Sequence, residues 1–280
     1  MLSVVQLPLV PNSKLLAVPL FPNSKFLFVM FCSKFQLLFA GLPLLSHHGS
    51  VCPLSVVTVV VVDVVCLQET HCVSQADCTL WFSSSGFLSC LSPGSNHSCG
   101  CVILYHPSLT LVDSWTDTGG RYLQCEFSLC DKSFRVCCLY APNRNPDRGQ
   151  FLDDVSDKVN PSVPSLLVGD FNTVFDRSKD RRGSNPLDDS CESSVHLAAL
   201  FEACCVTDIW QCMHPDSSAF TWTRPDGSIA SRIDLCGVPY VWVPSVSSCD
   251  IVPCPFSNHC ALLVSLTIPD VVPPGPGLWK

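Results

Sequence analysis

A few polar side chains that could act on phosphate esters stand directly beside apolar runs in this 280-residue chain. They are Glu69, Tyr140, Asp170, Asn172, Asp234 and His259. Carboxylates suit a hard cation such as Mg²⁺, which offsets phosphate charge, and a histidine held by an aspartate can donate or accept a proton. Together these residue types predict a metal-assisted phosphodiesterase site.

Taken singly, each of these residues also has a structural interpretation. Asp170 could cap the turn that follows it, as aspartate often does. Glu69 could be a loop carboxylate, and Tyr140 could end an ordinary amphipathic strand. A lone histidine such as His259 is more often structural than catalytic. Single positions therefore leave both interpretations open.

The segments that must position these residues have mostly the pattern of strands. The β-branched run over residues 55–67 is typical of a strand buried on both faces. We expect further strands over residues 100–105, 110–115, 121–129, 133–140 and 165–168. Helical spacing predicts helices over residues 148–159 and 192–205, with a polar loop over 176–189. Closely spaced strands favour antiparallel pairing, and the whole order predicts an α+β fold with sheet packed on sheet.

The charge balance limits how the chain could meet a phosphate. With 24 acidic and 16 basic residues the net charge is -8, which excludes nucleic-acid binding through bulk electrostatics. A phosphate partner must be met locally, by a metal or a basic cluster. The best candidate for DNA backbone contact lies in the polar loop and comprises Arg177, Lys179, Arg181 and Arg182. Asp176 and Asp180 stand among these residues, so a solvated loop is the alternative.

The 20 cysteines are scattered, and no Cys-x-x-Cys pair occurs, which excludes zinc-ribbon and thioredoxin motifs. Adjacent pairs such as Cys137 and Cys138 favour reduced, buried thiols in an intracellular protein over a disulfide scaffold.

Residues 1–55 differ from the rest, because Leu, Val, Phe, Pro and Ser dominate and Pro-Asn-Ser-Lys recurs at 11–14 and 22–25. Prolines and lysines interrupt each apolar run, which disfavours a signal peptide or a membrane anchor. We expect a poorly structured apolar extension.

Six motifs in one order resemble the endonuclease/exonuclease/phosphatase superfamily, whose fold is DNase-I-like. The motifs are Leu67-Gln68-Glu69-Thr70-His71, Tyr140-Ala141-Pro142-Asn143, Gly169-Asp170-Phe171-Asn172, Phe220-Thr221-Trp222, Ser231-Arg232-Ile233-Asp234 and Ser257-Asn258-His259. The tyrosine and Ser-Arg-Ile-Asp motifs favour its nuclease branch. The nearest resemblance is to the endonuclease domain of non-LTR retrotransposon polyproteins. It implies a four-layer α/β/β/α sandwich over residues 56–268 and a linker-like tail over 269–280.

The resemblance also implies roles for individual residues. Glu69 would be the principal Mg²⁺ ligand, with Mn²⁺ as an alternative ion, and Asn258 would lie at the metal. Asp170 would position or deprotonate the attacking water, which Asn172 would orient. Tyr140 would contact the phosphate, and His259, oriented by Asp234, would stabilise charge in the transition state. Arg232 would join the basic cluster in contacting DNA. The implied product is a nick with a 3′-hydroxyl.

Two departures from the family pattern bear on activity. The family's first strand carries an asparagine followed by glycine, and we find no equivalent in residues 1–55, so this strand is expected to be missing or replaced. Asn258 stands where the family has aspartate, which removes one negative charge beside His259.

Three functions follow as alternatives. The first is a Mg²⁺-dependent DNA endonuclease inside the cell, nuclear or cytoplasmic, with DNA as its partner and no protein partner implied. The second is an inactive retroelement remnant that at most binds nucleic acid. The third is a membrane-associated phosphatase of the same superfamily, with residues 1–55 as its anchor.

Overall fold

The computed structural model describes residues 62–83, 85–95, 97–183, 192–254 and 257–269, together with the backbone of residues 26–32. Most of the apolar N-terminal stretch, including its Pro-Asn-Ser-Lys repeats, lies outside the described residues, as do residues 55–61 of the expected first strand. The expected tail over 269–280 lies outside them from residue 270 onward.

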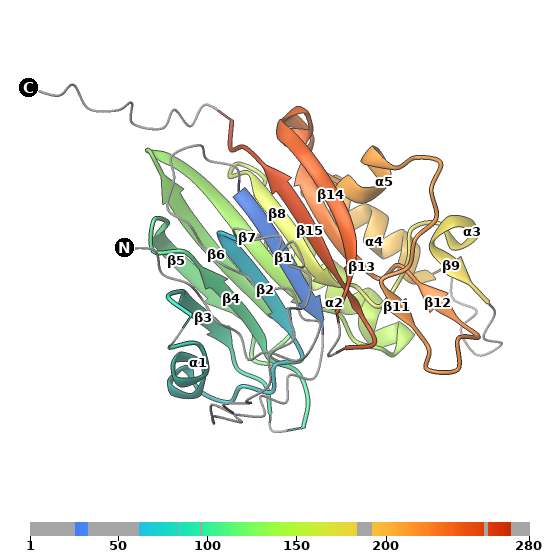
Figure 1. Ribbon diagram of the computed structural model, residues 1–280, viewed down its shortest axis with the longest axis horizontal. Coiled ribbons are helices and arrows are strands. Elements are labelled where there is room, and N and C mark those ends of the chain that lie inside the picture. The colour runs from blue at the N-terminus through green and yellow to red at the C-terminus, as the bar shows by residue number, and fades with distance from the viewer. Residues whose placement is uncertain are drawn as a thin grey trace, which may run out of the picture.

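Two six-stranded sheets face each other (Figure 1). The first sheet has the strand order β14 (Val246–Pro253), β15 (Cys260–Leu266), β1 (Phe26–Cys32), β2 (Val64–Gln68), β4 (Cys101–Tyr105) and β3 (Leu88–Ser92). The second sheet has the order β10 (Val206–Asp208), β13 (Asp234–Pro239), β8 (Ser165–Asp170), β7 (Lys132–Tyr140), β6 (Tyr122–Leu129) and β5 (Thr110–Thr116).

Apolar residues from both sheets meet between them. Val64 and Ile103 of the first sheet belong to the same buried cluster as Phe127, Val136 and Val168 of the second. Because successive side chains of a strand point to opposite faces, the alternate residues Cys137 and Leu139 of β7 belong to a separate cluster on the outer face. Both faces of the central strands are therefore buried, which explains their nearly continuous apolar sequences.

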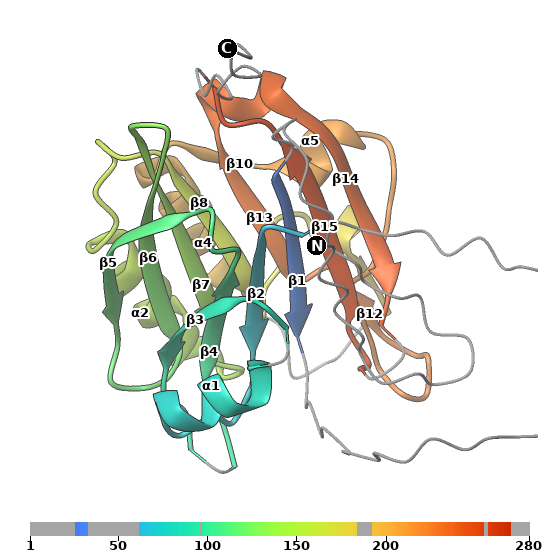
Figure 2. The ribbon, with the colours of Figure 1, turned by 60° about the vertical axis from the view of Figure 1, so that its left-hand side comes forward.

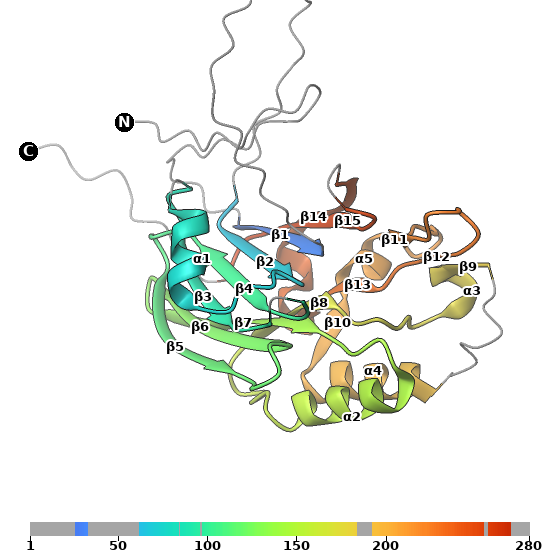
Figure 3. The same cartoon turned by 90° about the horizontal axis from the view of Figure 1, so that it is seen from below.

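Helices cover the outer faces of the sheets. Helices α2 (Asn145–Ser156) and α4 (Glu192–Ala203) pack side by side on the second sheet (Figure 3). Helix α1 (Gln75–Phe82) lies against the outer face of the first sheet, where Cys78 packs with Leu67 and Val102. The expected α/β/β/α sandwich is confirmed.

Several smaller elements flank or connect the two sheets. Helix α3 (Arg177–Asp180) leads into β9 (Arg181–Arg182), which forms a three-stranded sheet with β12 (Ala230–Ser231) and β11 (Trp222–Thr223). Helix α5 (Ile209–Met213) follows β10, and the 3₁₀ helix η1 (Tyr240–Ser245) precedes β14. The segment over residues 176–183, expected to be a loop, thus contains short regular elements.

Strand β1 occupies the place where the family's first strand was expected to be missing or replaced. It runs antiparallel to β15 and parallel to β2, with Cys32 opposite Gln68 (Figure 2). The expectation that residues 1–55 form a poorly structured extension is therefore wrong for residues 26–32, and a domain boundary at residue 56 excludes this strand. The apolar sequence Phe-Leu-Phe-Val-Met-Phe-Cys suits a central strand, and it carries no asparagine.

The other expected elements agree closely with the observed ones. The strands expected over residues 110–140 form the antiparallel set β5, β6 and β7. Strand β8 pairs with β7 in parallel, because helix α2 connects them and returns the chain in the same direction. This parallel pair fixes the position of the site.

Candidate active site

Three polar residues lie in one row at the inner face of the second sheet. Tyr140 at the end of β7 lies opposite Asp170 at the end of β8, and Asp170 lies opposite Asp234 at the start of β13. All three follow the alternation that places Val136, Val168 and Cys236 between the sheets. Strand register therefore brings together residues that are far apart in the sequence.

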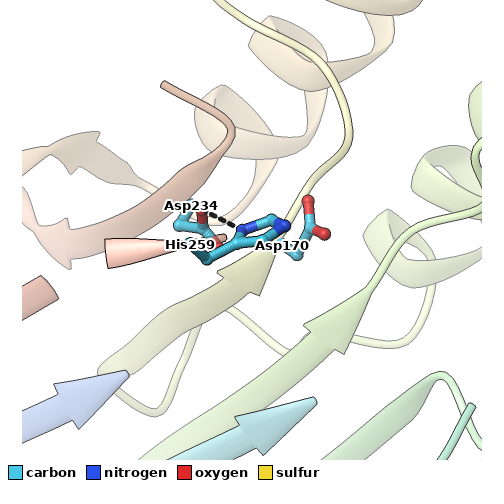
Figure 4. A group of neighbouring side chains, drawn as sticks. All are labelled: Asp170, Asp234 and His259. Carbon is cyan, nitrogen blue, oxygen red and sulfur yellow. Dashed lines mark hydrogen bonds and ion pairs between the residues drawn. The ribbon is translucent and has the colours of Figure 1, made fainter. Parts of the chain in front are cut away.

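His259 joins this row from the first sheet, directly before β15. Its Nδ1 lies 2.8 Å from Asp234 Oδ2, and Figure 4 shows the imidazole between Asp234 and Asp170. One ligand atom each from Asp170, Asp234 and His259 lies within 4.8 Å of the others. The Asp234 side chain is fully buried and that of His259 is 10% exposed. These three residues form the carboxylate–histidine cluster.

The electrostatics of this cluster favour a charged imidazole. Burial disfavours the charge on His259, but the carboxylates of Asp234, Asp170 and Glu69 outweigh it and raise the histidine pKa to about 9. At neutral pH the ring therefore carries a proton on both nitrogens. Because Nδ1 faces Asp234, the remaining nitrogen can donate to a negatively charged substrate atom.

Glu69 and Tyr140 meet at the same edge. The Tyr140 hydroxyl donates a hydrogen bond to Glu69 Oε1, and the Tyr140 side chain is buried. Glu69 adopts a left-handed backbone conformation with φ of 51°. The loop after it is held by hydrogen bonds from Thr70 N to Gly100 O at 3.1 Å and from His71 N to Cys99 O at 3.0 Å.

Asn172 is tied to the neighbouring strands. Its backbone N–H donates to Asp170 Oδ1 at 2.8 Å, and its Nδ2 donates to Ala141 O at 2.8 Å. Asn172 also has a positive φ, of 50°, which asparagine tolerates better than most residues. The structure thus brings Glu69, Tyr140, Asp170, Asn172, Asp234 and His259 to one edge of the sandwich, through the contacts and register given above.

Thr221 has a role that sequence reasoning did not assign. Its buried Oγ1 accepts hydrogen bonds from the backbone N–H groups of Ile233 at 3.1 Å and Asp234 at 3.0 Å. Its carbonyl oxygen accepts from Cys260 N at 2.6 Å, and the next residue, Trp222, forms a β-bridge with His259. The threonine thus fixes the backbone on both sides of the Asp234–His259 pair. The signal in the sequence was the position of Thr221 between two aromatic residues, Phe220 and Trp222.

Arg121 was also missed. Its guanidinium carbon lies 4.9 Å from the centre of the Tyr140 ring, and its Nη1 donates to Tyr140 O at 3.1 Å. This half-buried cation therefore stabilises the position of Tyr140 from the ring face. Its position directly after Gly119 and Gly120, at the start of a strand, gave no sign of this contact.

Asn258 is exposed, and its backbone oxygen accepts a hydrogen bond from Thr223 N at 3.4 Å. It neighbours His259 in sequence, but unlike the residues of the cluster it is exposed. A metal-ligating role for Asn258 stays a prediction.

The basic residues divide into two groups. Arg177, Lys179 and Arg182 are exposed, and Arg181 is half-buried. Arg232 is 1% exposed and contacts Asp180 and Asp208, so the prediction that it contacts DNA is wrong. A cation beside a site motif resembles a ligand-binding residue in sequence, but its buried acidic partners are far away in the chain.

The donor set fits a hard divalent cation. Asp234 Oδ1 is buried and has no hydrogen-bond partner in the part of the chain that the structure describes. Glu69 and Asp170 supply further carboxylate oxygens at the same edge, and such oxygens are the preferred ligands of Mg²⁺. An unsatisfied buried carboxylate oxygen is costly unless a proton donor or a cation approaches it.

The sandwich and its cluster define a class of hydrolase with the DNase-I-like fold. The sequence profile of the Endonuclease/Exonuclease/phosphatase family matches residues 43–268, and the chain belongs to this family. A curated relative is the transposon TX1 uncharacterized 149 kDa protein of Xenopus laevis. It is 26% identical over 218 residues, which are 74% of this chain and 16% of that protein. The chain thus spans about a sixth of that relative.

Solved structures show the same fold. The AP endonuclease of Leishmania major superimposes with a TM-score of 0.63 at 15% identity, covering 90% of this chain and 93% of that one. A 3′ phosphatase from Neisseria, bound to a product DNA hairpin, gives a TM-score of 0.60 at 16% identity, covering 74% of this chain and 90% of that one.

Within the described residues, no helix is long and apolar enough to span a membrane.

Proposed function

We propose that this chain is a Mg²⁺-dependent endonuclease that nicks DNA and leaves a 3′-hydroxyl. The observation that carries the proposal is the buried carboxylate–histidine cluster, with the hydrogen-bonded Glu69–Tyr140 pair at the same edge. The endonuclease and DNA-bound phosphatase among its structural neighbours support a DNA phosphate ester as the substrate. The similarity to a transposon protein supports an origin in a retroelement.

Glu69 and Asp170 are the residues that would hold the metal beside the buried Asp234 Oδ1, with Asn258 at the rim. A bound Mg²⁺ would offset negative charge on the phosphate and favour hydroxide formation from water. Mn²⁺ has the same preference for oxygen ligands and is the alternative ion.

The chain's own residues act in the remaining steps. Asp170 accepts a proton from the attacking water, which Asn172 orients from its position beside Ala141. As the water oxygen bonds to phosphorus, the bond from phosphorus to the 3′-oxygen breaks, and the departing oxygen takes up a proton from solvent to become the 3′-hydroxyl. The imidazolium of His259 donates from its free face to a phosphate oxygen, while Asp234 holds the opposite nitrogen. Tyr140 donates toward the phosphate once its bond to Glu69 is exchanged. Catalysis is therefore mostly electrostatic, with donors placed in advance where negative charge accumulates.

DNA would be held locally. Arg177, Lys179 and Arg182 are exposed on α3 and β9, and Arg182 lies over the Phe220 ring at 5.3 Å. The net charge of -8 predicts weak binding that falls steeply as salt rises. A chain acting on chromosomal DNA would work in the nucleus.

A second candidate is a non-catalytic protein that binds nucleic acid. Two observations favour it. The residue paired with Gln68 at the end of β1 is Cys32, where no amide is available, and Asn258 supplies no charge beside His259.

Plasmid nicking by the purified chain separates the two functions. The Asp170→Ala variant should lose at least about 100-fold in Mg²⁺-dependent nicking, because water activation and a metal ligand are lost together. Asp154→Ala, which removes an exposed carboxylate on α2, is the matched control and should retain full activity. Extension of the nick by a DNA polymerase would demonstrate the 3′-hydroxyl. Folded wild-type protein that binds DNA but never nicks it would establish the non-catalytic function.

A further inference from the structure

Arg232 is the largest fully buried side chain that carries a formal charge among the described residues. Its Nε donates to Asp180 Oδ1 at 2.9 Å, and its Nη2 lies 2.8 Å from the same oxygen. Its Nη1 lies 2.6 Å from Asp208 Oδ2, and its guanidinium carbon lies 4.9 Å from the Trp210 ring. One side chain thus connects three segments of the chain.

Asp180 links Arg232 to helix α3, which carries two of the exposed cations. Its second oxygen, Oδ2, accepts a hydrogen bond from Asp176 N at 3.1 Å, so the carboxylate also closes the single turn of α3. Its backbone oxygen accepts from Arg232 N at 2.8 Å. Helix α3, which carries Arg177 and Lys179, is therefore fixed at its C-terminal end to the Arg232 backbone and side chain.

The connection continues into β9 and towards the site. Ser231 and Ala230 of β12 pair with Arg181 and Arg182. On the other side, Asp234 lies only two residues after Arg232, and Ile233 between them accepts a hydrogen bond from Phe171 N at 2.9 Å. A continuous path of backbone contacts thus joins the cation-bearing segment to Asp234.

Burial also changes the charge that a ligand meets. Asp180 is 1% exposed, and its carboxylate contacts Arg232 and the backbone N–H of Asp176, so it presents almost no negatively charged surface to a ligand. Arg177, Lys179 and Arg182 are exposed on the same segment, and so is Asp176. A ligand at the surface of α3 and β9 therefore meets one carboxylate fewer than the sequence suggests.

We infer that Arg232 is a positioning residue: it fixes the cation-bearing segment α3–β9 at a set distance from Asp234, so that DNA backbone contact aligns one phosphate with the cluster. This inference rests on the proposed function for its catalytic consequence. Its binding consequence does not depend on turnover. Because Arg232 itself is buried, any change in DNA contact on its replacement must act through the segment.

Arg232→Met tests the inference, and Arg135→Met is the matched control. Arg135 is also largely buried and paired, with Glu126 at 2.9 Å, but it lies nearer the start of β7, away from the site. Circular dichroism verifies folding of both variants. Fluorescence anisotropy with a labelled DNA duplex, at several salt concentrations, then reports how many phosphate contacts are made.

For Arg232→Met we expect about tenfold weaker binding at low salt and a salt slope smaller by about one to two. For nicking, KM should rise more than kcat falls. Arg135→Met should match the wild type in slope and in KM. An unchanged slope in Arg232→Met, or the same change in Arg135→Met, would overturn the inference.

Two milder variants cover the case in which Arg232→Met does not fold. Asp180→Asn preserves shape but loses the ion pair, and Arg232→Lys preserves charge but loses the planar fork. Both variants should show a smaller salt dependence of DNA binding than the wild type, and the decrease should be smaller for Arg232→Lys than for Asp180→Asn. If these folded variants bind like the wild type, Arg232 only stabilises the fold. If wild-type protein binds DNA but never nicks, the proposed activity fails while the slopes still decide the role of Arg232.

Discussion

The two sheets contribute to the site in different ways. The second sheet supplies Tyr140, Asp170 and Asp234 by strand register alone, from neighbouring strands on one face. The first sheet supplies Glu69 and His259 from loops just outside β2 and β15, and the loop after β2 needs left-handed backbone at Glu69 and His71. Register is set by many hydrogen bonds, whereas a loop depends on a few. In the second sheet, activity should therefore be most sensitive to substitutions that change the chemistry of a side chain. In the first sheet, it should be most sensitive to substitutions that change the backbone of a loop.

The largest effect is expected in the second sheet, for Asp234→Asn. The amide preserves size and the backbone bonds to Thr221, but it removes the charge that stabilises a protonated His259. We expect nicking to fall by about 10²–10⁴-fold with little loss of folding stability. Rates and thermal unfolding of the two proteins, measured side by side, check this. A rate within threefold of the wild type would mean that His259 acts without Asp234.

The sequence predicted the residues placed by strand register better than the loop that positions Glu69. Tyr140, Asp170 and Asp234 stand at the ends of apolar runs, so strand alternation and a known order of motifs located them. The left-handed loop after β2, held by Cys99 and Gly100, could not be read because its partners are about 30 residues away, where no motif marked them.

The two clearest failures have related causes. Arg232 was taken for a surface cation because its partner Asp180 lies 52 residues away and looked like a surface acid. Strand β1 was missed because prolines and lysines flank its apolar run, and only the gap between β15 and β2 selects that run as a strand. In both cases, a contact with a distant part of the chain decides the structure, and the local composition does not indicate it.

A smaller effect is expected in the first sheet, for Gly100→Ala. Gly100 has φ of 97°, and a Cβ there would lie 2.7 Å from Thr70 Oγ1, in the loop that positions Glu69. We expect about tenfold less nicking and about 1–3 kcal/mol lower unfolding free energy, from strained backbone. Gly86→Ala is the control, because its φ is 78° but its Cβ would meet nothing within 4 Å. Equal loss of nicking in both variants would show that backbone strain alone, not the contact with Thr70, impairs the site.

The smallest effect concerns the rim of the first sheet, where Asn258→Asp restores a carboxylate beside His259. Asn258 is exposed, so its new charge is partly screened and should raise nicking by only about three- to tenfold. The gain should be greatest at low Mg²⁺, because an added carboxylate mainly strengthens metal binding. Asn160→Asp adds the same charge on an exposed loop elsewhere and should change nothing. A slower Asn258→Asp variant would mean that the loop before β15 has adapted to the neutral amide, and that both sheets now constrain the cluster.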